Sequence, residues 1–211
     1  MTPADRDWSV AHQVTSLLLQ YPDEQLLERL PMLRQAAGCQ PAEVARPLLR
    51  FLDHLERTPL TALQQHYVET FDLKRKCCLF LTYYPHGDTR RRGEALLRFK
   101  QTYRAAGLDL GDDELPDHLA VVLEFAAVGD PEAGGRLLAE HRPGIELLRA
   151  ALGQLHSPYA DVVEAVVHTL GRLSAAEAEA AMRLAQQGPP QEQVGLEAFI
   201  PVDSLKVGGR A

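Results

Sequence analysis

Between Tyr67 and Phe125 the chain reads YVETFDLKRKCCLFLTYYPHGDTRRRGEALLRFKQTYRAAGLDLGDDELPDHLAVVLEF. This stretch holds the densest run of aromatic residues and most of the clustered basic residues. Two polar segments stand out in it: HGDTRRRG, His86–Gly93, and ELPDHL, Glu114–Leu119. We interpret the stretch as the functional middle of the protein, and the segments on either side as helices that hold it in place.

The flanking segments are expected to be helical. Leu and Ala dominate the composition and aromatic residues make up only 6%, which favours helix over sheet. Apolar residues recur at helical spacing, as in the stripe Leu60, Leu63, Tyr67 and Phe71. No internal repeat of solenoid length is found. The sequence therefore predicts a single all-α domain, a helical bundle of roughly eight to eleven helices.

This helical domain is expected to span residues 1–187, and residues 188–211 form a C-terminal tail. The tail begins with a glycine and two prolines and has no helical period. It is predicted to be a mobile end or a docking strap. Its candidate anchors are Leu196, Phe199 and Ile200.

Local signals predict several helix boundaries. Asp5 or Asp7 can cap a first helix, Asp23 a second, and Pro31 is expected to kink or split that second helix. An interior proline costs about 3 kcal/mol, so Pro47 is expected to be the first residue of the next helix.

Further boundaries follow from the same rules. Thr58 should cap a helix that has proline at its first position, Asp88 or Thr89 a long helix, and Pro116 should start another. Ser174 and Glu177 are spaced as a capping box. The run from Cys77 to Tyr84 can be a buried strand or a helix; we expect a helix, because no other strand is predicted to pair with it.

Charge and hydropathy exclude some classes of function. The net charge of −7 argues against general binding to nucleic acid or to anionic membranes. No apolar run is long enough to span a membrane, and acidic residues stand where a signal peptide needs basic ones. The cytoplasm is therefore the expected location. The three cysteines, Cys39, Cys77 and Cys78, fit a reducing compartment, and the adjacent pair is interpreted as small core residues.

Recognisable catalytic motifs are not found. The sequence lacks GxSxG, GxxxxGK and GxGxxG, and its histidines show no HxxxH or HxH spacing. HGD at positions 86–88 is interpreted as a turn with a cap. The basic runs Lys74–Lys76 and Arg90–Arg92 either bind phosphate or form a solvated face; we favour the latter, paired with Asp109, Asp112 and Asp113.

Three patterns in the middle stretch carry a family resemblance. They are YxxxFD (Tyr67, Phe71, Asp72), HGDTRxRG (His86–Gly93) and ELPDHLxxxLE (Glu114–Glu124). With the opening LLLQYPDEQLL, Leu17–Leu27, they resemble the NarJ family of nitrate reductase assembly chaperones. That family lies within the wider group of redox-enzyme maturation chaperones related to TorD and DmsD.

The resemblance implies an all-helical fold of TorD/NarJ type. It implies a cytoplasmic, system-specific chaperone, not an enzyme, that binds the N-terminal peptide of the apo catalytic (α) subunit of respiratory nitrate reductase. In that role it supports molybdenum cofactor insertion and assembly before the enzyme docks at the membrane. The expected partners are this peptide and molybdenum cofactor biosynthesis proteins. Nucleic acid, direct membrane insertion, and a metal or cofactor of its own are not expected.

Such a client is expected to lie as an amphipathic helix in an apolar groove. We place the groove between the segment ending at Tyr84 and a helix starting at Pro116. Tyr83 and Tyr84 would form a partly solvated wall, since each has an apolar ring and a polar hydroxyl. Asp117 and His118 would lie at the rim. The expected client-binding residues are Tyr67, Phe71, Phe80, Tyr83, Tyr84, His86, Arg90, Arg92, Glu114, Pro116, Asp117, His118, Leu119, Leu123 and Glu124.

Two alternatives stay open. The first is a chaperone for another molybdoreductase. The second, from a different class, is a helical metal-dependent hydrolase, suggested by the adjacent Asp117 and His118. An HD-type phosphohydrolase needs the histidine before the aspartate, so the order found here weakens that alternative.

Overall fold

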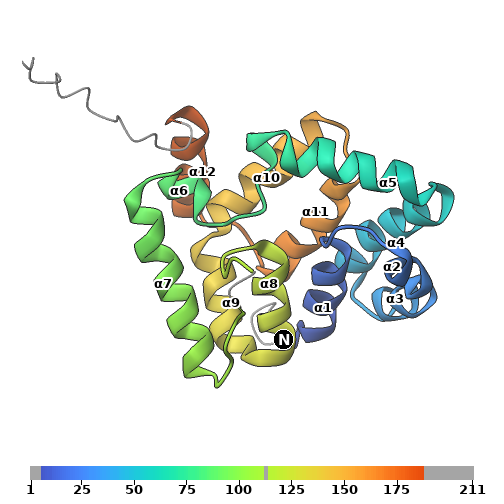
Figure 1. The fold of residues 1–211 in the computed structure, drawn as a ribbon, viewed down its shortest axis with the longest axis horizontal. Coiled ribbons are helices and arrows are strands. Elements are labelled where there is room, and N and C mark those ends of the chain that lie inside the picture. Colours follow the sequence, from blue (N-terminus) through green and yellow to red (C-terminus); the bar gives the residue numbers. More distant parts are fainter. Residues whose placement is uncertain (1–5, 112–113, 188–211) are drawn as a thin grey trace, which may run out of the picture.

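A computed structural model describes residues 6–111 and 114–187, and this part of the chain is all-helical, as predicted (Figure 1). Its α-helices are α1 (Ser9–Leu18), α2 (Glu24–Glu28), α3 (Leu30–Gly38), α4 (Ala42–Arg57), α5 (Leu60–Tyr67), α6 (Tyr83–His86), α7 (Arg90–Ala105), α8 (Leu119–Glu124), α9 (Pro131–Glu140), α10 (Arg142–Gln154), α11 (Tyr159–Thr169) and α12 (Ala175–Gln187). π-Helical turns, Val68–Asp72 and Phe125–Gly129, extend α5 and α8, and Arg75–Cys77 is a 3₁₀ turn.

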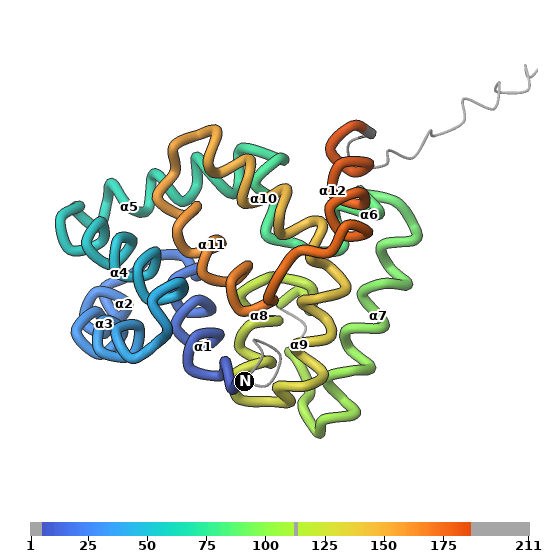
Figure 2. Tube along the Cα trace, turned by 180° about the vertical axis from the view of Figure 1, so that it is seen from behind, coloured from blue at the N-terminus to red at the C-terminus, as the bar shows by residue number. Residues whose placement is uncertain are grey.

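Helices from the two ends of the chain pack together at the centre of the fold. In Figures 1 and 2, α1 lies beside α11, and α11 also packs against α4 and α10. The side chains of His12 on α1 and Thr169 on α11 are joined at 3.0 Å. On the other side of α1 lies α8, which the chain reaches after α7 has crossed the outside of the bundle. One continuous apolar core results.

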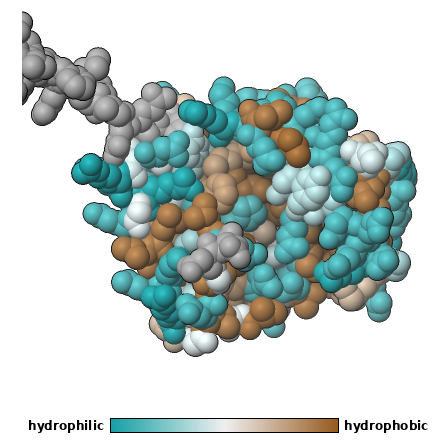
Figure 3. Space-filling model, in the orientation of Figure 1, coloured by the Kyte–Doolittle hydropathy of each residue, from teal (hydrophilic) through white to brown (hydrophobic). Residues whose placement is uncertain are grey.

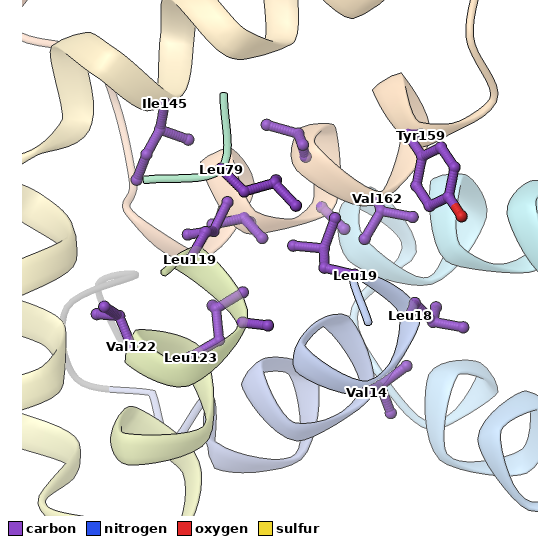
Figure 4. Packing of buried hydrophobic residues seen from close by; sticks show 14 of the residues in the cluster. Val14, Leu18, Leu19, Leu79, Leu119, Val122, Leu123, Ile145, Tyr159 and Val162 are labelled. Carbon is purple, nitrogen blue, oxygen red and sulfur yellow. The ribbon is translucent and has the colours of Figure 1, made fainter. Parts of the chain in front are cut away.

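The core includes the short segment before α6. Leu79 and Leu81 are buried there together with the α8 residues Leu119 and Leu123. Figure 4 shows Leu79 near Leu119 and Leu19, with Ile145 of α10 to the upper left. The middle of the sequence is therefore packed against helices from both ends.

Most local helix signals act as predicted. The Asp23 carboxylate accepts a hydrogen bond from Leu26 N at 2.7 Å, and Asp7 accepts one from Ser9 N at 2.9 Å. Pro31 lies at the start of α3, just after the break between α2 and α3. The Ser174–Glu177 capping box forms in both directions, at 2.7 and 3.2 Å. The alternative cap Asp5 lies outside the described residues.

Three boundary predictions are wrong, those at Pro47, Thr58 and Pro116. Pro47 does not start a helix but lies inside α4, which begins at Ala42. The cost of an interior proline is offset because α4 buries a full apolar face, Pro47 included, against α3 and α11. Thr58 does not cap α5, because its hydroxyl donates backward to His54 O at 2.8 Å, at the end of α4.

The prediction of a helix across residues 77–84 is wrong for most of that run. After the 3₁₀ turn the chain is extended, and Phe80 forms an isolated antiparallel bridge with His118. The pairing partner that the prediction lacked is the ELPDHL segment itself, through a single bridge rather than a strand. Pro116 does not start a helix either: residues 116 and 117 form a turn, His118 pairs with Phe80, and α8 begins at Leu119.

Within residues 6–111 and 114–187, no helix combines the length and the apolar character needed to cross a membrane. The proposed tail, with its candidate anchors Leu196, Phe199 and Ile200, lies outside the described residues. The division of the chain after residue 187 therefore stays a prediction.

Candidate functional site

ELPDHL, one of the two polar segments singled out in the sequence, pairs with the extended chain before α6. Leu119 N donates to Leu79 O at 2.8 Å, and Leu81 N donates to Asp117 O at 3.0 Å. Side chains alternate along an extended chain, so Leu79 and Leu81 point into the core while Phe80 points outward. Phe80 and His118 then lie side by side, with ring centroids 5.2 Å apart.

A groove of about 460 Å³ lies along this pair. Its lining residues come from the turn after α1, from α5, from the extended segment, from the loop before α8 and from α8 itself. They are Gln20, Tyr21, Tyr67, Phe80, Glu114, Leu115, His118, Ala120, Val121 and Glu124. In Figure 3, hydrophobic residues gather around a hollow near the centre of the face, bordered by hydrophilic ones.

Aromatic rings form much of the groove wall. Tyr21 is half exposed and meets Tyr67 edge-on, with centroids 5.4 Å apart. Tyr67 is buried and its hydroxyl donates to Leu19 O at 3.2 Å. Burial, with a smaller effect of Asp72, raises the pKa of Tyr67 to about 12, so this wall stays uncharged at neutral pH.

The charged side chains that line the groove are acidic. Glu114 and Glu124 are exposed at its edge. Burial lowers the pKa of His118, although nearby Asp117 opposes the shift, so this ring is mostly neutral at pH 7. The groove is therefore suited to a ligand with apolar side chains and a positive charge.

Asp117 is not at the rim of the groove, contrary to the prediction. Its side chain is 0% exposed, and its Oδ2 accepts hydrogen bonds from Thr82 N at 3.1 Å and Thr82 Oγ1 at 2.5 Å. The guanidinium of Arg92 lies 3.9 Å from the same oxygen. His118 caps α8 by accepting from Ala120 N at 3.3 Å. Asp117 thus lies behind the wall, and His118 is part of it.

Most of the other predicted site residues are buried in the core. Tyr83 and Tyr84 are buried, so they do not form a partly solvated groove wall. The Tyr84 hydroxyl donates to Cys78 O at 2.9 Å. Pro116, Leu119 and Leu123 are buried as well. Phe71 is half-buried against Tyr159, at a centroid distance of 4.8 Å.

The predicted site residues of the HGDTRRRG segment lie away from the groove lining. His86 lines two other hollows, beside His141 and Arg98, and Arg90 is exposed at the start of α7. The groove thus unites Tyr67, Phe80, Glu114, His118 and Glu124 from the predicted set. The prediction missed Gln20, Tyr21, Leu115, Ala120 and Val121. All five carried a usable signal, because each lies inside the family-like segment Leu17–Leu27 or Glu114–Glu124.

Other proposed chemistries gain no support. Among the described residues, no group of three or more His, Cys, Asp or Glu side chains is arranged to hold a metal ion. Cys77 is buried in the core and its thiol is free, as is that of Cys78, and burial raises the pKa of both. Asp109 pairs with Arg104 at 3.3 Å rather than with the basic runs, and Asp112 and Asp113 lie outside the described residues.

Comparison with known proteins places these features in a family context. Residues 38–165 match the family described as nitrate reductase delta subunit. The chain is 32% identical over 174 residues to the probable nitrate reductase molybdenum cofactor assembly chaperone NarJ of Bacillus subtilis, covering 81% of this chain and 94% of that protein. It is 35% identical over 150 residues to NarJ of Escherichia coli, covering 70% of this chain and 64% of the relative.

Two further relatives complete the comparison. The chain is 44% identical over 163 residues to the nitrate reductase-like protein NarX of Mycobacterium tuberculosis, covering 77% of this chain but spanning only 24% of NarX. A crystal structure described as a putative redox enzyme maturation protein from Archaeoglobus fulgidus has a similar fold. Its TM-score is 0.57 at 26% identity, with 77% of this chain and 93% of that chain covered.

Proposed function

Because this chain belongs to the nitrate reductase delta subunit family, we propose that it is an assembly chaperone for a respiratory nitrate reductase. It binds the N-terminal peptide of the apo α subunit in the groove beside Phe80 and His118. It supports molybdenum cofactor insertion before the enzyme docks at the membrane. The NarJ relatives support this role, since their names describe molybdenum cofactor assembly chaperones.

The observation that carries the proposal is the groove itself. Its volume and its aromatic and aliphatic lining suit the apolar face of an amphipathic segment. Tyr21 and Leu115, 49% and 43% exposed, present apolar surface that the core does not use. An apolar surface with polar residues around it is typical of a site where a partner docks.

The acidic edge of the groove favours a client peptide that carries a basic residue. Glu114 and Glu124 are exposed at the groove, so a basic residue on the client would meet a carboxylate there. Asp117, which was predicted at the rim, is buried and is not available for this contact. Edge charges of this kind set orientation and association rate more than affinity.

A matched pair of leucines tests the groove by calorimetry with the synthetic N-terminal peptide of the nitrate reductase α subunit. Leu115 lines the groove, whereas Leu155 does not, and both are 43% exposed. Leu115→Ala should weaken peptide binding by about 1 kcal/mol, roughly fivefold. Leu155→Ala should leave the affinity unchanged. Equal affinities for both variants and the unaltered protein would move the site off this face.

The same peptide assay separates the alternative clients. N-terminal peptides of other molybdoreductases should compete more weakly than the nitrate reductase peptide if the client is as proposed. The cytoplasmic location and an encounter with molybdenum cofactor biosynthesis proteins are part of the proposal. The expectation that the protein is not an enzyme agrees with its NarJ relatives, which are named as chaperones.

A further inference from the structure

A polar cluster lies directly behind the Phe80–His118 wall and is not used by the groove lining. It consists of Thr82, Arg92 and Asp117. Asp117 Oδ2 accepts from the backbone and the hydroxyl of Thr82, and Arg92 Nε donates to the same hydroxyl at 3.3 Å. The cluster therefore ties the first turn of α7 to the extended segment and to the loop before α8.

Arg92 also contacts the groove wall from behind. Its guanidinium carbon lies 5.4 Å from the centre of the Phe80 ring, within the range of a cation–π interaction. The side chain is only 19% exposed. Phe80 is thus held between the charge of Arg92 and the edge-on ring of His118.

The geometry of this cluster is poorly suited to stabilising the fold. Arg92 Nη2 and Asp117 Oδ1 are buried without a hydrogen-bond partner, and the closest approach of the two charges is 3.9 Å. Burying a charged pair costs several kcal/mol, which only good geometry and full hydrogen bonding repay. Apolar residues of similar size would fill this space at lower cost, which points to a role in fixing geometry.

We propose that Arg92 and Asp117 are positioning residues that hold Phe80 and His118 as the wall of the peptide groove. Arg92 acts on the Phe80 ring, and Asp117 acts on the main chain through Thr82 N. Neither side chain is required to touch the client. Only the effect on peptide binding rests on the proposed function. The positioning of Phe80 and His118 is a property of the peptide-free protein.

The surroundings of Arg92 define what else acts on it. Asp88 lies one helical turn earlier, with its carboxylate 3.4 Å from Arg92 Nη1, and is 68% exposed. Because water screens this exposed pair, it contributes little. The contacts with Phe80, Thr82 and Asp117 are therefore the ones that fix the guanidinium.

The test compares Arg92→Met, which keeps the aliphatic length without the charge, with Arg91→Met, its exposed neighbour on α7. Nuclear magnetic resonance of the histidine ring protons in the peptide-free protein reports on the wall. Arg92→Met should shift the His118 signals, because the Phe80 ring beside them moves, and should leave those of His54 in place. Arg91→Met should shift neither.

Calorimetry with the α-subunit N-terminal peptide gives the second measurement. Arg92→Met should weaken binding about tenfold, while circular dichroism stays unchanged. Asp117→Asn, which keeps the size of the side chain but not its charge, should act in the same direction and serves if Arg92→Met does not fold. The positioning role is overturned if the His118 signals of Arg92→Met are unchanged, whether or not the affinity for the peptide falls. If Arg92→Met does not fold, the His118 signals of Asp117→Asn decide in the same way. If the unaltered protein does not bind the peptide, the proposed function fails, and the ring signals still decide the positioning.

Discussion

His12 should make the stability of the protein depend on pH. It lies on α1 with 6% of its surface exposed, and its Nε2 is 3.0 Å from Thr169 Oγ1 on α11. The Thr169 hydroxyl also donates to Val166 O at 2.7 Å, so this buried contact between α1 and α11 includes the main chain of α11. Burial lowers the pKa of His12 to about 4, against smaller opposing effects of the Ala126 backbone and Asp7.

The sign follows from proton binding. Between the folded pKa of about 4 and the unfolded value of 6.5, the unfolded chain binds more protons than the folded one. The free energy of unfolding therefore falls as the pH is lowered through this window. A shift of this size corresponds to a loss of about 3 kcal/mol between about pH 7 and pH 4, a large part of the stability of a typical domain.

Urea unfolding at a series of pH values, with His12→Gln beside the unaltered protein, measures the effect. Glutamine can hydrogen-bond to Thr169 but does not titrate, so the variant should lose about 3 kcal/mol less on acidification. The same substitution at His168, whose side chain is 40% exposed, is the control, because it removes a histidine from the surface and not from the core. Parallel pH curves for His12→Gln and the unaltered protein would refute the reasoning.

Two further predictions concern packing and the tail. Gly134 of α9 lies so close to the turn after α8 that an added Cβ would be 2.5 Å from Ala126 Cα, whereas Gly135 has open space. Gly134→Ala should therefore cost about 1–3 kcal/mol in thermal unfolding, and Gly135→Ala should add up to about 1 kcal/mol; equal effects would contradict this close approach. A chain ending at Gln187, where α12 ends, should melt within a few degrees of the full chain, and a collapse of the fold would show that Phe199 or Ile200 anchors the core.

Local signals were sufficient to predict much of the helical fold. A cap such as Asp23 and a capping box such as Ser174–Glu177 act within one turn of the chain, so the sequence contains all the interacting groups. Proline and glycine likewise act on their own backbone. The resemblance to the NarJ family rested on motif spacing, and the family comparison confirms it.

Pro47 shows where a local rule fails. Its cost is a local property that the sequence reveals, but the compensation comes from the packing of α4 against α3 and α11. Those contacts join residues far apart in the sequence. No window around Pro47 contains them, so only the folded chain decides that α4 continues through the proline.

The groove was decided by the same kind of long-range contact. The sequence by itself identified Phe80 and His118 as candidates, and it determined that ELPDHL is a special segment. That this segment pairs with the extended chain at Phe80 depends on backbone bonds between residues widely separated in the sequence, such as Leu119 N to Leu79 O. This pairing buries Asp117 and turns Phe80 toward the groove, because an extended chain sends alternate side chains to opposite sides. Tyr21 reaches the same wall through the packing of α1 against α8.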